Sequence, residues 1–92
     1  MSRTAPEILE AAAGHILSRA QSRDLPEGER SMARAVTAFN ALTGLQLGER
    51  DGWIFMAVLK MARATAGSLN RDDYEDGAAY MALAGESAEA DR

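Results

Sequence analysis

The chain has 92 residues, no cysteine and a formal net charge of −4 at pH 7, with 14 acidic residues against 10 Lys and Arg. Its length corresponds to one small domain, and the absence of cysteine excludes disulfides, thiolate metal sites and cysteine nucleophiles. The acidic balance argues against direct nucleic-acid binding, because phosphate contacts need clustered Lys and Arg.

The first predicted helix runs from about Thr4 to about Gln21. Thr4 and Glu7 have the spacing of a capping box, in which each residue's side chain bonds the other's backbone N–H. Apolar residues then recur at helical spacing. The stretch SRDLPEGER, residues 22–30, contains proline and glycine and predicts a loop.

A second helix is predicted from about Glu29 to Thr43, followed by Gly44 as its C-terminal glycine. Its apolar side is expected to face a core. In the segment that follows, Leu45 and Leu47 are expected to tuck under the other helices. The side chains assigned to the inward face are Met32, Ala35, Val36, Phe39 and Leu42.

The third predicted helix begins near Gly48 and ends near Thr65. Its sequence DGWIFMAVLKMAR is apolar around almost its whole circumference, which indicates a helix buried on most sides. Trp53 is therefore interpreted as a core residue. No apolar stretch approaches the roughly 18 residues of a membrane span, and no signal peptide opens the chain, so we expect a cytoplasmic protein.

The fourth helix is predicted to begin after Asn70, with Asp73 at the capping-box position. Residues 85–92 are polar and small and are expected to fray. No strand pattern appears, so the chain predicts a single all-α domain, residues 1–92, built as a small bundle of about four helices. The expected inward stripe of the last helix is Tyr74, Gly77, Ala78, Met81 and Ala84, and structural roles are assigned to Trp53, Phe39, Tyr74 and Tyr80.

Lys60 and Arg63 are the unusual charges, because they share one side of the most apolar helix. They either extend from the edge of that helix to water, or pair with Asp72 and Asp76, which share a face of the next helix. The short turn between the two helices makes them antiparallel neighbours and favours contact between these charges. Glu75 is expected to face water.

A magnesium site is the alternative interpretation of the same carboxylates. Asp72, Asp76 and Glu29 would hold Mg²⁺, and Lys60 with Arg63 would hold phosphate. The E-x-x-E and D-x-x-D pairs are similar to those of all-α nucleotide pyrophosphohydrolases, although their separation along this chain is greater than in that family. Arg30 is a further candidate for a phosphate contact or a salt bridge. No cofactor is expected on the structural interpretation.

Two further features have structural and functional interpretations. His15 is the single histidine and has no second His or Cys beside it, so a structural or exposed residue is favoured over a base or ligand. Gly77 and its small neighbours in the last helix allow close approach, either to the preceding helix or to a second subunit. A homodimer would also help a chain with so few large apolar residues to complete its core.

The segments GERSM, AFNALTG, DGWIFMAVLKMAR and DDYEDGAAYMALAGE resemble, in this order and spacing, a group of short phage and prophage proteins of unassigned function. The resemblance covers most of the chain after residue 23 and implies an all-helical fold and an origin in a phage or mobile element. The chain has Asn70 where relatives often have a histidine, which weakens any catalytic role that needs that histidine. The positions that match the shared pattern are Glu29, Arg30, Asn40, Trp53, Lys60, Arg63, Asp72, Asp76 and Tyr80.

These features favour a binding protein over an enzyme, because the charged residues can be explained structurally. Small acidic helical proteins of this kind include host-directed accessory and counter-defence proteins such as anti-CRISPR inhibitors. The expected partner is a host protein or ribonucleoprotein complex with a basic surface, with no direct nucleic-acid or membrane contact. The alternative is a magnesium-dependent nucleotide pyrophosphohydrolase-like protein, or one that sequesters a nucleotide.

Overall fold

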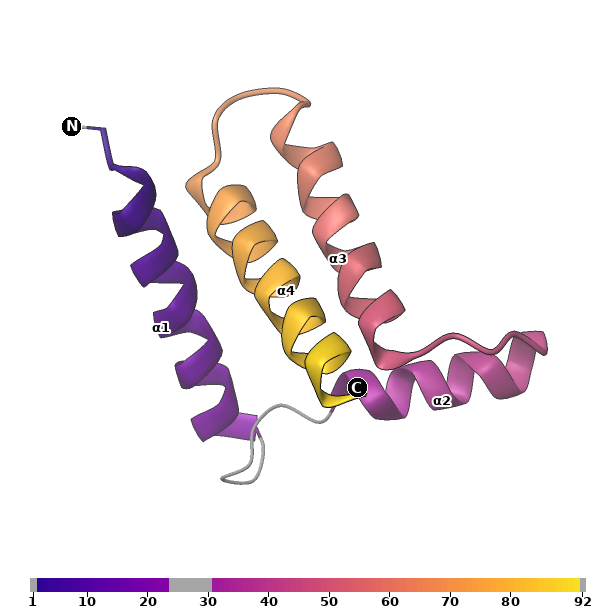
Figure 1. The fold of residues 1–92 in the computed structure, drawn as a ribbon. Coiled ribbons are helices and arrows are strands. Elements are labelled where there is room, and N and C mark those ends of the chain that lie inside the picture. The colour runs from indigo at the N-terminus through magenta and orange to yellow at the C-terminus, as the bar shows by residue number, and fades with distance from the viewer. Residues whose placement is uncertain (1, 24–30, 92) are drawn as a thin grey trace.

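The computed structural model describes residues 2–23 and 31–91. It contains four helices, α1 (Ala5–Arg23), α2 (Ser31–Thr43), α3 (Glu49–Ala64) and α4 (Arg71–Ala90) (Figure 1). Among the described residues there is no strand, and no helix is both long and apolar enough to cross a membrane. The predicted all-α fold, a small bundle of four helices, is confirmed.

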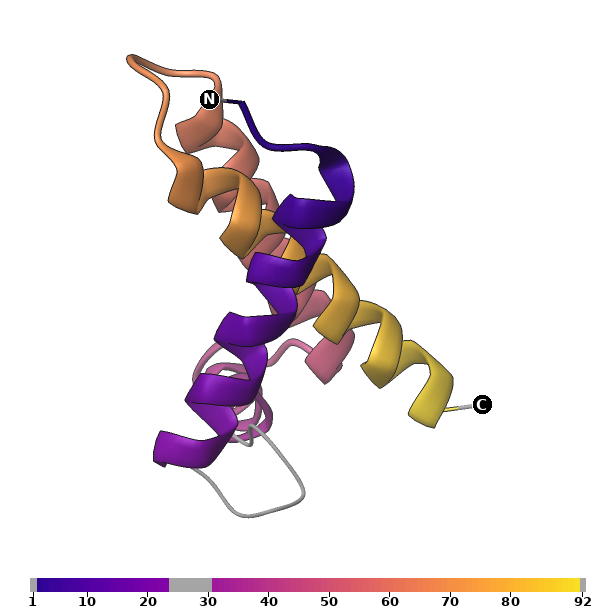
Figure 2. The same cartoon turned by 90° about the vertical axis from the view of Figure 1, so that its left-hand side faces the viewer.

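Helices α1, α4 and α3 form one layer, and α2 forms an arm that extends from it. Helix α4 lies between α1 and α3 and packs against both, whereas α2 runs across the end of α3 (Figures 1 and 2). In the described part of the chain α1 packs on α4 alone, and α2 packs on α3 alone. The Cα radius of gyration is 14.2 Å, compared with about 12 Å for a compact domain of this length. The molecule is therefore more open than a closed bundle.

The helix ends follow the local sequence signals. The backbone N–H of Thr4 donates to Glu7 Oε1 at 2.7 Å and that of Glu7 donates to Thr4 Oγ1 at 3.3 Å, which confirms the capping box. Gly44 follows α2 with a positive φ of 77°, as its C-terminal role requires. Asn70 caps α4 by accepting from the backbone N–H of Asp72 at 3.0 Å.

The segment between α2 and α3 is held by a side chain. The Asn40 amide donates to the Leu47 carbonyl at 2.9 Å and its oxygen accepts from the Leu47 N–H at 3.0 Å. Gly48 then starts α3, and its N–H donates to Asp51 Oδ2 at 2.8 Å. These bonds fix the linker without burying it, and Leu45 and Leu47 are exposed rather than tucked under the helices.

The buried core of the described chain is small. Trp53 is 6% exposed and is the largest apolar residue in that core. The other buried apolar residues are Ala12, Ala57, Ala79 and Ala84. The large apolar side chains that remain exposed are Leu9, Leu17, Phe39, Leu42, Leu45, Leu47, Ile54, Phe55, Val58, Met61, Leu69, Tyr74 and Met81.

Three expectations about burial were therefore wrong, for one physical reason. Helix α3 is not buried on most sides, since Phe55 is 69% exposed and Val58 and Met61 are also exposed. Helix α2 has no buried residue among those described, and Tyr74 and Met81 of α4 are exposed. In a single layer each helix is covered only where its neighbour lies, so apolar residues on the remaining faces meet solvent.

The two chain segments expected to be irregular are partly helical. Helix α1 continues to Arg23, and the rest of the predicted 22–30 loop lies outside the described residues. At the other end, the polar stretch expected to fray continues α4 to Ala90. Glu, Ala and Ser are compatible with a helix, so the polar composition alone did not end it.

Gly52 allows α2 to approach α3, and its replacement by alanine is expected to weaken this contact. An added Cβ would overlap the Met32 sulfur and lie 2.9 Å from Val36 Cγ2. The overlap should cost about 1–3 kcal/mol, enough to cancel or exceed the gain of about 1 kcal/mol in helix propensity. In Gly14→Ala the new Cβ meets nothing within 4 Å, so urea denaturation should show this control to be stabilised.

Candidate functional site

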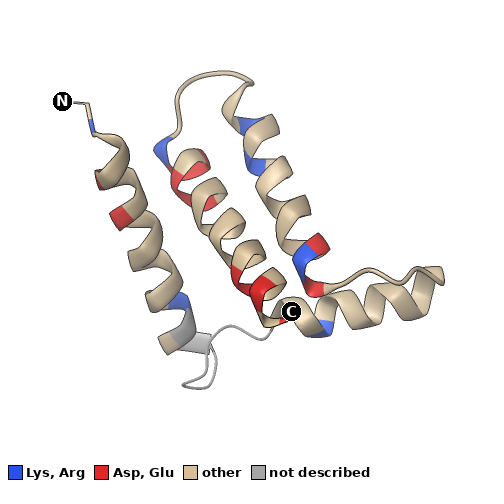
Figure 3. Ribbon diagram, viewed as in Figure 1, with Lys and Arg blue, Asp and Glu red and all other residues tan. Residues whose placement is uncertain are grey.

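Asp76 joins the three helices of the layer. Its Oδ2 lies 3.0 Å from Lys60 Nζ of α3, and its Oδ1 accepts from Arg19 Nη2 of α1 at 3.1 Å. The side chains of Lys60 and Asp76 are largely buried, at 12% and 14% exposed. The acidic turn of α4 thus faces the basic end of α3 (Figure 3).

The charges around Asp76 favour its ionised form. Burial alone would raise the pKa of Asp76, but the hydrogen bond and charge of Lys60, together with Arg19, outweigh burial and lower the pKa below its usual value. Because both carboxylate oxygens already have cationic partners, Asp76 serves to connect α1, α3 and α4.

Glu75 is the second buried carboxylate and it faces α1, not water as expected. His15 Nε2 lies 2.6 Å from Glu75 Oε1, and Arg3 Nη1 lies 2.5 Å from Glu75 Oε2. The hydrogen bond from His15, and then that from Arg3, lower the pKa of Glu75. The expectation failed because α4 lies between two helices, and the side of α4 that carries Glu75 is covered by α1.

The two carboxylates predict a loss of stability in acid. Both pKa values are lower in the folded chain than the usual ~4 of the unfolded chain, so their contribution is complete above about pH 4. It is lost as the pH falls through the lower folded values, when the carboxylates are protonated. Urea denaturation from pH 7 to pH 3 should show a smaller acid-dependent loss for Asp76→Asn than for the wild type. An equal loss in both proteins would contradict this role.

Asp72 and Asp76, two of the carboxylates considered for magnesium, line an open cavity of about 510 Å³ at the junction of α3 and α4. Arg63 and Asp72 are exposed there, and Arg63 has no ion pair with any described residue. In residues 2–23 and 31–91 no three His, Asp or Glu side chains are grouped as a metal would require. Glu29 and Arg30 lie outside the described residues. The cavity is lined by Lys60, Arg63, Ala66, Ser68, Asn70, Asp72, Asp73 and Asp76.

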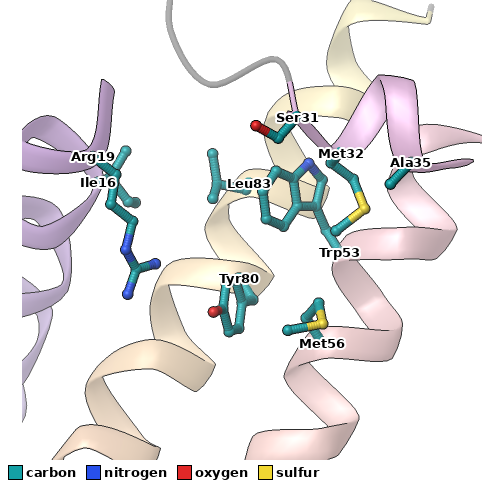
Figure 4. Close-up of a pocket in the computed structure, with 9 residues that line it drawn as sticks. All are labelled: Ile16, Arg19, Ser31, Met32, Ala35, Trp53, Met56, Tyr80 and Leu83. Carbon is teal, nitrogen blue, oxygen red and sulfur yellow. The ribbon is translucent and has the colours of Figure 1, made fainter. Parts of the chain in front are cut away.

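A second cavity, of about 340 Å³, lies among all four helices (Figure 4). Trp53 and Tyr80 stack beside it with ring centroids 5.8 Å apart and planes 21° apart. The Arg19 guanidinium lies 5.7 Å from the centre of the Tyr80 ring, within range of a cation–π contact. Trp53 Nε1 donates to Glu49 Oε2 at 3.2 Å. Arg19 thus connects this aromatic pair to the Asp76 cluster.

Two apolar grooves open on the surface. The first, the α2–α3 groove, has a volume of about 580 Å³. The second, the α3–α4 groove, has a volume of about 260 Å³. The α2–α3 groove is lined by Met32, Ala35, Val36, Phe39, Leu47, Asp51, Gly52, Phe55 and Met56. The α3–α4 groove is lined by Ala57, Lys60, Met61, Ala64, Asp73, Tyr74, Gly77, Ala78 and Met81.

Asp73 is the exceptional residue of the α3–α4 groove. It is 8% exposed, yet its carboxylate has no hydrogen bond or ion pair with another described residue. The cap of α4 is made by Asn70 without it, so the capping role predicted for Asp73 is wrong. The sequence did carry a signal, because Asp73, Gly77, Tyr80 and Ala84 follow the i, i+4, i+7, i+11 spacing of one helix face.

Comparison with known proteins places the chain in a family. Residues 7–88 match the domain of unknown function DUF6378. The chain belongs to the DUF6378 family. The match begins within α1 and ends within α4, so it includes residues of all four helices. No curated protein and no solved structure matches the chain. The DUF6378 match does not itself assign a substrate or a partner.

Proposed function

We propose that this DUF6378 protein acts by binding, as a small phage-type accessory protein that occupies the surface of a host protein or ribonucleoprotein complex. A counter-defence protein of the anti-CRISPR-like kind, working in the host cytoplasm, fits this proposal. The observation that carries it is the exposed apolar surface of α2, α3 and α4, which includes Phe39, Phe55 and Met61. Large exposed apolar surfaces on small proteins mark sites of protein–protein contact.

The α2–α3 groove suits a second copy of the chain. Helix α2 has 13 residues and no buried side chain among those described, and a helix of this length is marginal in water without tertiary packing. Helix α2 therefore needs further packing partners whenever the protein is folded, and a second copy of the chain would supply them. Helices α1, α4 and α3 form a single layer, and a second layer is what a stable helical domain ordinarily has.

The α3–α4 groove then remains for a different partner. Met61, Tyr74 and Met81 supply apolar contact area on this side. The chain carries a net charge of −4, so a partner with a basic surface would be attracted to it. Such attraction acts through solvent and weakens as salt shortens its range.

Capture by the full chain tests the binding proposal. Wild type, Met61→Asp and Leu17→Asp would each be immobilised and exposed to host extract, followed by purification of the retained protein and direct measurement of its affinity. A partner should bind wild type and Leu17→Asp, lose at least ~10-fold in affinity for Met61→Asp, and bind more weakly between about 50 and 500 mM salt. Affinity unchanged by Met61→Asp and by salt would reject the proposal.

The second candidate function is magnesium-dependent nucleotide hydrolysis or nucleotide sequestration at the 510 Å³ cavity. The observation in its favour is that Lys60, Arg63 and Asp72 meet there, so that phosphate and cation binding groups are adjacent. Thermal shift with magnesium and a nucleotide panel tests binding, and pyrophosphate release tests hydrolysis. A shift without product indicates sequestration, and neither response in wild type rejects both forms.

A further inference from the structure

We propose that the α3–α4 groove is a receptor for a basic side chain of the partner, arginine or lysine, whose charged end binds Asp73. This inference rests on the proposed binding function and names the chemistry that the groove recognises. It starts from an energetic problem. Asp73 is 8% exposed, and burying a carboxylate that has no partner among the described residues is costly.

The walls of the groove fit the rest of such a side chain. Met61, Tyr74, Gly77 and Ala78 are among the residues that line the groove. An arginine or lysine has an aliphatic stem that packs on apolar surface and a charged end that seeks a counter-ion. The lining of the groove includes both kinds of group, apolar side chains and Asp73.

The nearest cation of the groove does not satisfy Asp73. Lys60 also lines the groove, but its Nζ is held 3.0 Å from Asp76 Oδ2. Asp76 in turn has Arg19 as its second partner, so two cations and one carboxylate share that cluster. Of these two groove residues, Lys60 is thus paired with Asp76, whereas Asp73 has no ion pair with a described residue.

Gly77 leaves space in the groove. A Cβ added at Gly77 would lie 3.5 Å from Lys60 Cβ, which is ordinary contact. The packing of α4 on α3 therefore does not require glycine at this position, and the missing side chain leaves that space in the groove open. This gives the small residues of α4 a binding role in addition to helix packing.

A titration with n-butylguanidinium chloride tests the receptor directly, without a partner protein. At constant ionic strength, backbone amide NMR signals of residues 57–64 and 73–81 should shift saturably, with millimolar affinity as expected for a ligand of this size. The neutral analogue pentanamide should bind at least ~10-fold more weakly, since it lacks the charge-assisted hydrogen bond. Equal affinity for the two ligands would overturn the inference.

Two matched variants separate a specific contact from a general effect of charge. Asp73→Asn should weaken n-butylguanidinium at least ~10-fold, whereas Asp72→Asn, which removes the same charge from an exposed neighbour, should change it less than ~2-fold. Equal losses in the two variants would overturn the inference. Asp73→Asn should also melt at or above the wild-type temperature, because it removes an unpaired buried charge. A lower melting temperature would assign Asp73 a structural role and overturn the inference too.

Asp73→Asn in the capture experiment distinguishes the receptor inference from the proposed binding function. Loss of the partner by both Asp73→Asn and Met61→Asp supports the receptor. Loss by Met61→Asp alone overturns the receptor and leaves the binding function standing. A partner affinity that neither variant changes rejects binding through this groove altogether.

Discussion

Replacement of Trp53 by alanine is expected to lower the free energy of unfolding by about 3–5 kcal/mol, the usual cost of deleting a buried aromatic side chain. Trp53 is 6% exposed, stacks on Tyr80 with centroids 5.8 Å apart and donates to Glu49 at 3.2 Å. The other buried apolar residues of the described chain are alanines, so Trp53 is the one large side chain of this buried core. Small domains are stable by only about 5–15 kcal/mol, so this loss removes a large share of the total and should lower the melting temperature.

Leu17→Ala is the matched control, since it also deletes a large apolar side chain but from an exposed position on α1. Urea denaturation followed by far-ultraviolet circular dichroism should show a change within about 0.5 kcal/mol for this variant. Trp53→Phe should fall between the two, because it keeps an aromatic ring beside Tyr80 and loses the bond to Glu49. Equal stability of Trp53→Ala and Leu17→Ala would show that the core lies elsewhere.

The helices and their ends could be predicted from the sequence because the signals are local. A capping box at Thr4 and Glu7, a glycine at 44 and a cap at Asn70 each act through bonds within a few residues. The all-α fold follows from these signals and from helical spacing. These local signals do not specify which side of each helix packs against another helix.

Helix α3 shows this limit most clearly. Its apolar circumference predicted burial on most sides, but burial depends on what covers each face. Trp53 and Ala57 are buried, while Ile54, Phe55 and Val58 of the same run are exposed. The chain has apolar residues on more helix faces than its own helices can cover. Some of these residues are therefore buried and others form an exposed apolar surface. The sequence pattern alone does not distinguish the two groups.

The ion pairs of α4 also differ in how far apart the partners lie along the chain, and this decides which of them could be predicted. The pairing of Lys60 with Asp76 follows from two antiparallel helices joined by a short turn, and this pair lies 3.0 Å apart. Arg19 and His15 are 57 and 60 residues from their partners on α4. These two contacts depend on the packing of α1 beside α4, which no local sequence signal specifies. The unpaired state of Asp73 is likewise a property of the assembled layer.

Phe55→Asp is expected to convert the proposed dimer into a monomer, because Phe55 is 69% exposed and lines the α2–α3 groove that we propose for a second copy. In a two-fold symmetric dimer each substitution occurs twice. At about 2 kcal/mol for each central aromatic residue, the two together weaken association by about 4 kcal/mol, or roughly 10³-fold in Kd. Sedimentation equilibrium on both proteins measures this change, and Leu9→Asp, on the exposed side of α1, should leave the dimer intact.

The monomer should also lose the structure of α2, and this distinguishes the proposed dimer from an incidental association. Once the second copy is removed, Ser31–Thr43 keeps only its contact with α3 and has too few residues to stay helical alone. Amide hydrogen exchange in Phe55→Asp should therefore accelerate in α2 while α3 and α4 keep their protection. A wild type that stays monomeric at millimolar concentration would contradict the dimer. So would a monomeric Phe55→Asp with α2 as protected as in the wild type, because α2 would then need no second copy to cover it.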